Sequence, residues 1–489
     1  MVVFIAIKQD YLEVIMFRTR FAPSPTGYMH IGNLRTALYA YLIAKKAHGV
    51  FILRIEDTDQ KRNVPKAVQA IYNGLALAGI TYDEGPDKDG GHGPYVQSQR
   101  KAIYGQYARQ LIEQGDAYYC FCQKEDRTDL GEERVEGLKD PCRDLSPSDV
   151  QKNLDQGLQP VVRQRIPLEG ESSFFDHVYG TITIDHKQLD DQVLLKSDGF
   201  PTYNFANVVD DHLMAISHVI RGQEYLSSTP KYNLLYEAFG WEYPEYIHLP
   251  HIIKEDGKKL SKRAGDPTFE DLVNMGYLPE AIVNYVALLG WNPGDDRELF
   301  SLQELIEVFD MDRISKSSAA FSMDKLRWIN GEHVRALSPE AFHAVALPWY
   351  PENLKDFDLM QLSQLIQIRT DCLGDIPEML SFLADLPEYD VTLFENQKSK
   401  STIESAKAVL SAVIPLLKEQ EDFSNAALFD TLKTYAKESG FKVGTTMWPI
   451  RTALSGLPAS AGGATELASL LGKKETLRRL RLGLDKLLA

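Results

Sequence analysis

Hydrophobic and polar positions over residues 17–55 follow the order expected of a strand, a helix and a second strand. Residues 17–21 predict a short strand, and the segment 23–27 (PSPTG) predicts the turn that ends it. A stripe with helical spacing follows, and Gly49 is predicted to close that helix. The stripe consists of Leu34, Ala37, Leu38, Tyr41 and Leu42. The run Val50–Leu53 is almost continuously apolar, as in a parallel strand covered on both faces. A βαβ unit of this kind predicts an α/β domain with a parallel sheet.

The pattern changes between residues 117 and 189, a region that holds three of the four cysteines and a charged stretch at 124–140. We interpret this region as an insertion, because α/β-like apolar segments resume at Val193 and at 218–220.

From Ser301 onward helical periods dominate the chain. One example is a helix that Ser424 is predicted to cap and Gly440 to end. Its apolar stripe consists of Leu428, Leu432, Tyr435 and Ala436. A flexible loop is predicted at 457–465 (LPASAGGAT).

Composition narrows the class of protein. A length of 489 residues suggests roughly three domains. Four cysteines exclude a disulfide scaffold and predict a reducing cytoplasmic location, and no apolar run is long enough for a membrane helix. The net charge of −16 argues only weakly against a nucleic-acid partner, because such binding depends on a local basic face.

Residues 1–15 lack the basic leader of a secretory signal, so we expect the fold to begin at Met16.

Two short segments suggest phosphate chemistry. In residues 22–33 a turn leads into a helix N-terminus, where backbone N–H groups favour an anion, His30 could donate to a phosphate, and Gly32 permits close approach. Taken alone, this segment fits a plain turn with a packed histidine equally well. The segment 258–263 (KKLSKR) holds four cations in six residues, and such a run is more often a solvated loop.

The two segments together resemble the HIGH and KMSKS signatures of class I aminoacyl-tRNA synthetases. The segments 22–27, 55–59 (IEDTD) and 219–222 (VIRG) make the chain similar to bacterial glutamyl-tRNA synthetases. The resemblance continues through 324–331 (DKLRWING) and 447–456 (MWPIRTALSG), so it extends from Met16 almost to the end of the chain.

The resemblance implies a Rossmann-like parallel-sheet catalytic domain with an inserted α+β acceptor-binding domain, followed by an all-α anticodon-binding region. The expected divisions are an N-terminal extension (1–15), the catalytic domain in two parts (16–116 and 190–255), the insertion (117–189), a KMSKS-loop and stem-contact domain (256–335) and the helical region (336–489).

The implied reaction joins L-glutamate to ATP as glutamyl-adenylate with release of diphosphate, then transfers the glutamyl group to the terminal adenosine of tRNA(Glu), and of tRNA(Gln) if the enzyme is non-discriminating. ATP and Mg²⁺ are implied, and a cytoplasmic monomer without membrane contact is expected. By similarity the catalytic groups are His30, Lys259 and Lys262. The ATP-binding residues are His30, Gly32, Asn33, Lys259, Ser261, Lys262 and Arg263, with Asn33 standing where the named motif has a second histidine.

By the same similarity, Arg20 and Arg221 face the carboxylates of glutamate, which suits bidentate guanidinium pairing. Glu56 receives the ammonium group, and the pocket is completed by Ser24, Tyr203 and Asn207. From the residues alone, Glu56 would be a solvated turn and Tyr203 core packing. Arg221 is harder to explain in that way, because a charge at the carboxyl end of an α/β strand often faces a ligand.

Cys120, Cys122 and Cys142 have the spacing of zinc ligands, and some relatives hold structural zinc at these positions. Asp144 is the candidate fourth ligand, but three free thiols are the favoured alternative. Cys372 is expected in the core. In the helical region Arg369 occupies the position of an arginine near the third anticodon base, with a solvated helix charge as the alternative.

Other functions fit less well. An adenylyl- or cytidylyltransferase would not need the long helical region, and a non-catalytic RNA-binding relative would not need His30, Lys259, Lys262 and Arg221. A glutaminyl-tRNA synthetase usually ends in β-barrels, and the short enzyme that modifies a queuosine-bearing tRNA lacks an anticodon region.

Overall fold

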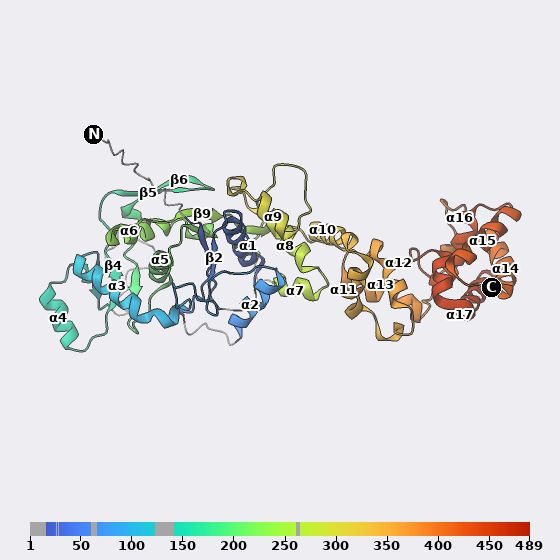
Figure 1. The fold of residues 1–489 in the computed structure, drawn as a ribbon, viewed down its shortest axis with the longest axis horizontal. Helices are drawn as coiled ribbons and strands as arrows, with labels where there is room; N and C mark the ends of the chain where they lie inside the picture. Colours follow the sequence, from blue (N-terminus) through green and yellow to red (C-terminus); the bar gives the residue numbers. More distant parts are fainter. Residues whose placement is uncertain (1–15, 26, 28, 60–65, 123–140, 261–264) are drawn as a thin grey trace, which may run out of the picture. The chain divides into compact units, whose positions relative to one another are not determined.

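The computed structural model describes residues 16–489 apart from 26, 28, 60–65, 123–140 and 261–264. The chain divides into two compact units (Figure 1). The first comprises Met1–Leu272 with Pro279–Met323, and the second comprises Val273–Leu278 with Asp324–Ala489. No helix in the described part of the chain is both long and apolar enough to cross a membrane.

The first unit is built around the predicted βαβ motif. Strands β1 (Arg18–Phe21) and β2 (Val50–Leu53) pair in parallel, and α1 (Ile31–Lys46) connects them. All five residues of the predicted helical stripe are buried. The prediction of a parallel α/β unit is therefore confirmed.

The prediction that Gly49 closes α1 is wrong by one residue. The helix ends at Lys46, and His48 rather than Gly49 has the left-handed conformation, with φ of 51°. A Cβ atom on Gly49 would lie 2.1 Å from the backbone oxygen of Phe17. Glycine is needed at position 49 because the chain passes so close to β1, not because it terminates the helix.

Further parallel strands extend this sheet. Strands β8 (His218–Gly222) and β9 (Glu245–Leu249) pair in parallel, and Ser217 N–H donates to the Arg18 oxygen at 3.0 Å, which sets β8 beside β1. Helices α5 (Tyr203–Leu213) and α6 (Thr229–Phe239) flank β8 in sequence. The carboxyl ends of β1 and β8 consequently lie next to each other.

Two features of the region predicted as an insertion differ from the sequence expectation. The hairpin β5 (Glu171–Asp176) and β6 (Gly180–Asp185) joins the parallel sheet, because Asp176 pairs with Tyr246 in β9 (Figure 1). Strand β7 (Val193–Leu195), where the α/β pattern was expected to resume, instead pairs antiparallel with β4 (Val161–Gln164), which pairs with β3 (Ala117–Cys120). The parallel sheet resumes only at β8, because an apolar run predicts a strand but not its partner.

The remaining elements of the first unit are short. The helices are α2 (Ala67–Leu77), α3 (Lys101–Gln114), α4 (Pro147–Asp155), α8 (Pro279–Leu288) and α9 (Leu302–Val308). Strands β10 (Ile252–Lys254) and β11 (Ala319–Phe321) form a separate parallel pair. Helix α7 (Phe269–Asn274) straddles the division between the units.

Among its described residues the second unit contains helices and no strand, as predicted. These helices are α10 (Met323–Ala336), α11 (Pro339–Ala346), α12 (Leu359–Ile366), α13 (Ile376–Ala384), α14 (Ile403–Glu419), α15 (Asn425–Glu438), α16 (Val443–Ser455) and α17 (Ala464–Leu488). Ser424 caps α15 by accepting from Ala427 N–H, and Gly440 follows its end with φ of 74°. The segment 457–465, predicted as a flexible loop, is fixed by two hydrogen bonds from Arg451, one to Ser460 Oγ at 3.1 Å and one to the Pro458 oxygen at 3.0 Å.

Candidate active site

A cleft of about 640 Å³ opens at the carboxyl ends of β1 and β8. In an open parallel α/β sheet this edge is where ligands bind. The structure brings together in the cleft wall nine of the residues predicted from sequence: Arg20, Ser24, His30, Gly32, Asn33, Glu56, Tyr203, Arg221 and Lys259. Asn207 is buried behind the wall and donates to the Tyr203 oxygen at 2.9 Å. Ser261, Lys262 and Arg263 lie outside the described residues.

One wall of the cleft is the N-terminus of α1. His30 lies at the N-terminus of this helix, as predicted. It is the N-cap residue, and its backbone oxygen accepts from Leu34 N–H at 2.9 Å. The N–H groups of the first turn before Leu34 have no partner in the helix's own hydrogen-bond ladder. No acidic side chain lies in this turn, and a Cβ atom on Gly32 would meet nothing within 4 Å. This helix end can therefore accept an anion that approaches the backbone closely.

Arg221 lies deeper, at the end of β8, with 5% of its surface exposed. Its guanidinium donates through Nε to His248 Nε2 at 3.0 Å and through Nη2 to Thr229 Oγ1 at 2.8 Å. Three tyrosine rings surround it with centroids 4.7 to 5.5 Å away, those of Tyr225, Tyr232 and Tyr246. Among the described residues no carboxylate forms an ion pair with this guanidinium. A buried cation in a cleft that lacks a protein counter-ion is suited to an anionic ligand.

Arg20 has a different environment. Its Nε and Nη2 donate to the two carboxylate oxygens of Asp211 at 3.0 and 3.1 Å, and its Nη1 donates to the Ile220 oxygen at 3.2 Å. Both side chains are almost fully buried. The side chain lines the cleft, but Asp211 already takes two of its donors in a bidentate pair.

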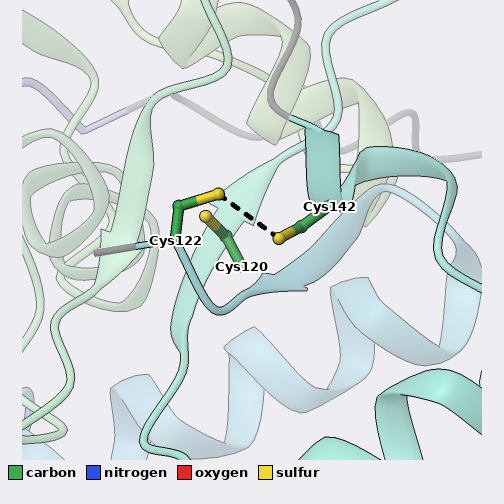
Figure 2. A group of neighbouring side chains, drawn as sticks. All are labelled: Cys120, Cys122 and Cys142. Carbon is green, nitrogen blue, oxygen red and sulfur yellow. Dashed lines mark hydrogen bonds between the residues drawn. The ribbon is translucent and has the colours of Figure 1, made fainter. Parts of the chain in front are cut away.

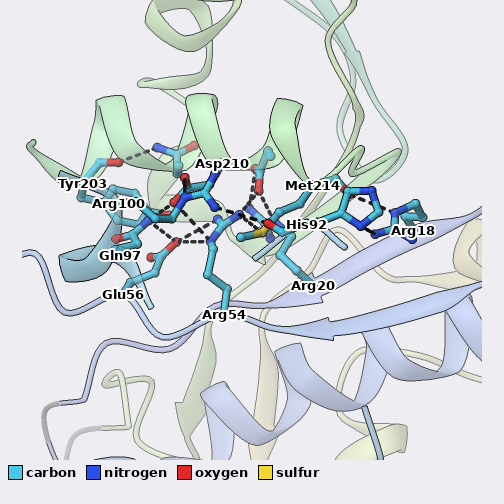
Figure 3. A network of polar contacts seen from close by, with 12 residues as sticks. Arg18, Arg20, Arg54, Glu56, His92, Gln97, Arg100, Tyr203, Asp210 and Met214 are labelled. Atoms are coloured by element: carbon cyan, nitrogen blue, oxygen red, sulfur yellow. Dashed lines mark hydrogen bonds and ion pairs between the residues drawn. The ribbon is translucent and has the colours of Figure 1, made fainter. Parts of the chain in front are cut away.

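Glu56 belongs to a buried ionic network (Figure 3). Its Oε1 accepts from Arg54 Nη2 at 2.9 Å, and Arg54 Nη1 also donates to Asp211 Oδ1 at 2.7 Å. Figure 3 shows Arg54 reaching from β2 towards the helix that holds Asp210. Asp210 accepts from Arg100 Nε at 2.7 Å. With only 4% of Glu56 exposed, the alternative of a solvated turn is wrong.

Sequence reasoning missed several members of this network: Arg54, Gln97, Arg100, Tyr104, Asp210 and Asp211. The available signal was Arg54, a charge directly after the apolar run Val50–Leu53. Together with Arg20 and Glu56 the network contains three guanidinium groups and three carboxylates. A balanced set of this kind avoids an uncompensated buried charge.

The network shifts the acidity of its carboxyl groups in opposite directions. Burial raises the pKa of Glu56 to about 7, although Arg54 opposes the shift. Burial also acts to raise the pKa of Asp211, but Arg20 and Arg54 outweigh it and the pKa is lowered. Tyr203 is half-buried rather than part of the core, and its ring lies 5.2 Å from that of Tyr225 across the cleft wall. Glu56 is therefore the carboxyl group in the cleft whose charge changes near neutral pH.

The three cysteines considered as candidate zinc ligands lie together (Figure 2). Their sulfur atoms are all within 4.8 Å of one another, and the sulfurs of Cys122 and Cys142 are 3.5 Å apart. Asp144 does not join them. Its side chain is 87% exposed, and its Oδ1 lies 3.5 Å from Nη1 of Arg165. The four-residue ligand set is thus wrong in its fourth member, because the Asp144 carboxylate is exposed beside Arg165 and does not belong to the group formed by the three sulfur atoms.

Two predictions concern the second unit. Arg369 is exposed, and its Nη1 donates to the backbone oxygen of Leu365 at 2.9 Å, so the guanidinium remains accessible to solvent. Cys372 is buried, as predicted, and its thiol donates to the Met275 oxygen at 3.2 Å.

Comparison with known proteins agrees with this geometry. Residues 16–328 match the family "tRNA synthetases class I (E and Q), catalytic domain", and residues 341–484 match the family "Anticodon binding domain". The chain is 53% identical over 477 residues to the glutamate–tRNA ligase of Clostridium novyi, covering 96% of this chain and 98% of that protein. It is 54% identical over 479 residues to the glutamate–tRNA ligase of Clostridium botulinum, covering 96% and 99%. The crystal structure of a glutamate tRNA ligase from Elizabethkingia meningosepticum, in complex with its amino acid, superposes with a TM-score of 0.87 at 34% identity, covering 96% of this chain and 100% of that one.

Proposed function

Because the chain belongs to the glutamate–tRNA ligases, class I enzymes that charge tRNA(Glu) with glutamate, we propose that its cleft binds glutamate and ATP through the residues described above. The proposal rests on one observation above all. Arg221 is a buried cation at a strand end with no carboxylate partner in the described residues.

Arg221 pairs with the side-chain carboxylate of glutamate, and Glu56 accepts from its ammonium group. Glutamate and glutamine have nearly the same shape, so packing does not separate them. A guanidinium does, because a carboxylate accepts two of its N–H groups whereas the NH₂ of a carboxamide is itself a donor. Ser24, Tyr203 and Arg20 bound the same space, and Asn207 donates to the backbone oxygen of Tyr203 one turn earlier in α5.

The α-carboxylate of glutamate is already an anion at neutral pH, so the first step needs alignment more than a general base. A carboxylate oxygen forms a bond to the α-phosphorus of ATP while the bond to diphosphate breaks. His30, the amides at Gly32 and Asn33, and Lys259 stabilise the negative charge on the phosphates, with Lys262, Ser261 and Arg263 completing the set from outside the described residues. A magnesium ion bound with ATP would neutralise part of the same charge. In the second step a ribose hydroxyl of the terminal adenosine attacks the glutamyl carbonyl, and AMP leaves.

The direct test uses purified tRNA(Glu) and tRNA(Gln) at equal concentrations with labelled glutamate and ATP. We expect label to be attached to tRNA(Glu) only when ATP is present. Label on both tRNA(Glu) and tRNA(Gln) would show that the enzyme is non-discriminating and charges both tRNAs with glutamate. Absence of label on tRNA(Glu) would refute the function. We further propose that the enzyme is a monomer that works in the cytoplasm. A sedimentation measurement tests the oligomeric state and should give a mass near 55.2 kDa.

Glutamate binding should depend on pH through Glu56. Only the ionised carboxylate accepts fully from an ammonium group, and the pKa of Glu56 is raised to about 7. The KM for glutamate should therefore fall about tenfold between pH 6 and pH 8, and kcat/KM should report a free-enzyme pKa near 7. The carboxyl group is more protonated when folded than when unfolded, so its contribution to stability falls as the pH rises from about 4.5 to about 7.

The matched control for this pH dependence is Glu56→Gln, which keeps the shape of the side chain. It should raise the glutamate KM at pH 8 and flatten the profile between pH 6 and pH 8. A Glu56→Gln enzyme with the wild-type pH profile would show that another group titrates there.

We also propose that Cys120, Cys122 and Cys142 hold a zinc ion in place of the free thiols favoured by sequence. Three sulfur atoms within 4.8 Å of one another suit three of the four tetrahedral positions around Zn²⁺. A zinc ion bound there would link β3 to the short helix at Pro141–Asp144. Protein dialysed against a mild chelator should retain about one zinc ion per chain by elemental analysis.

Two variants make the zinc prediction specific. Cys122→Ser should release the metal, whereas Asp144→Ala should retain it, because Asp144 lies outside the cluster. A zinc content near zero in the wild-type protein, with full charging activity, would instead establish three free thiols.

A further inference from the structure

We propose that His248 and Asp176 are positioning residues that hold Arg221 in the orientation needed to read a carboxylate, and that they thereby set the preference for glutamate over glutamine. This inference rests on the function proposed for Arg221. Neither residue carries a site motif in the sequence, and neither lines the cleft.

The contacts form a chain of three side chains. Arg221 Nε donates to His248 Nε2 at 3.0 Å, while Nδ1 of the same imidazole lies 2.7 Å from Asp176 Oδ2. His248 and Asp176 are fully buried. Arg221 Nη2 is held separately by Thr229 Oγ1 at 2.8 Å. Two fixed donors at different corners define the plane of the guanidinium, and Nη1 has no hydrogen-bond partner among the residues that the structure describes.

Asp176 determines which nitrogen of His248 bears the proton. Its Oδ1 accepts from the backbone N–H groups of Val178 and Tyr179 at 3.0 and 2.9 Å, and its Oδ2 accepts from His248 N–H at 3.0 Å. The carboxylate is therefore fixed as an acceptor opposite Nδ1. The Nδ1–H tautomer follows, and Nε2 presents a lone pair to Arg221.

The imidazole must be neutral for this arrangement, since a proton on Nε2 would oppose the Nε–H of Arg221. Burial lowers the pKa of His248 to about 4, and although the hydrogen bond to Asp176 opposes this shift, the charge on Arg221 adds to it. His248 thus remains neutral at the pH at which the enzyme works.

A comparison with Arg20 shows why the residue that orients Arg221 must be uncharged. Asp211 grips Arg20 directly, with two contacts at 3.0 and 3.1 Å, and so neutralises its charge. At Arg221 the carboxylate of Asp176 lies one imidazole ring away. The guanidinium is therefore oriented without an adjacent counter-ion, and its charge remains available to the substrate.

The experiment uses full-length enzyme with tRNA(Glu) and measures the KM and kcat for glutamate and the Ki for glutamine as a competitor. Asp176→Asn keeps the volume but can present an NH₂ group to Nδ1, which favours the wrong tautomer. We expect it to raise the glutamate KM about 10- to 30-fold with kcat within about threefold. The ratio of glutamine Ki to glutamate KM should fall about tenfold, which a loss of stability alone would not produce.

His248→Phe should have the same effect as Asp176→Asn, because it keeps an aromatic ring and removes the acceptor. His248→Gln retains an acceptor and should restore part of the wild-type ratio of glutamine Ki to glutamate KM. The two His248 variants therefore test the proposal even if Asp176→Asn fails to fold. The matched control is Asp191→Asn, which removes a buried carboxylate paired with Arg143 away from the cleft. This control should lower the melting temperature and leave the ratio unchanged.

Two different failures are distinguishable. If Arg221→Ala abolishes the discrimination while His248→Phe and Asp176→Asn keep the wild-type ratio, the positioning role is overturned and the proposed role of Arg221 stands. If Arg221→Ala itself keeps the wild-type ratio, the proposed carboxylate recognition is overturned.

Discussion

Replacing Arg221 by alanine should raise the KM for glutamate by about 10²–10³-fold, an effect expected when one partner of a buried, hydrogen-bonded charge pair is removed. The substrate carboxylate would enter a site lined by Tyr225, Tyr232 and Tyr246 without a cation to receive it. Because the site is shielded from water, solvent would not compensate for the lost charge. The measurement is kcat/KM for glutamate and the competing Ki for glutamine, with tRNA(Glu) held constant.

Arg221→Lys is the matched variant, since it keeps the positive charge. A lysine ammonium cannot form the two parallel N–H bonds and cannot use the acceptors His248 and Thr229 in the same way. It should recover only part of the lost affinity. Full recovery by lysine would mean that charge alone matters. If Arg221→Ala left the glutamate KM unchanged, the carboxylate would have to be recognised by Arg20 or by another group.

The sequence predicted the parts of this site that depend on local pattern. The turn before α1, the N-cap position of His30 and the open space above Gly32 follow from spacing within a dozen residues. Arg221 was predictable as a candidate because a charge after two buried apolar residues in a parallel strand points to the ligand edge of the sheet.

The residues that sequence reasoning missed are those whose partners lie far away along the chain. Arg54 meets Asp211 across 157 residues, and His248 meets Asp176 across 72. Each is an ordinary polar residue in its local context. Glu56 was interpretable as a solvated residue for the same reason, because nothing within the segment IEDTD shows that Arg54 and Gln97 enclose it.

Strand pairing was also beyond the local pattern. Val193 begins a genuine strand, but β7 joins β4 rather than the parallel sheet, whereas Asp176 ends a strand that reaches β9. A period-2 pattern identifies a face of a strand and does not identify its neighbour. This is why Asp176, in a region assigned from sequence to the insertion, contacts a residue that holds the amino-acid site.

The phosphate-binding side of the cleft should respond differently from the carboxylate side. His30→Ala and Lys259→Ala should each slow glutamyl-adenylate formation by about 10²–10³-fold in a single turnover, with the KM for glutamate changed little. Both residues line the cleft, with His30 at the N-terminus of α1, and in the proposed reaction the charge on the transferring phosphate increases in the transition state. An interaction that strengthens only in the transition state affects the rate and not ground-state binding. Lys262 lies outside the described residues, and Lys262→Ala should slow glutamyl-adenylate formation in the same way.

Thr36→Ala is the control in the same cleft, because Thr36 Oγ1 donates to the Gly32 oxygen within α1 and needs no ligand. Its rate should stay within about threefold of wild type, as expected for the loss of one exposed neutral hydrogen bond. His30→Asn should recover part of the rate, since its amide can still donate to a phosphate oxygen. A His30→Ala or Lys259→Ala enzyme within twofold of the wild-type rate would remove that residue from the phosphate clamp. The negative charge would then be stabilised by the helix amides and by Mg²⁺ on the phosphates.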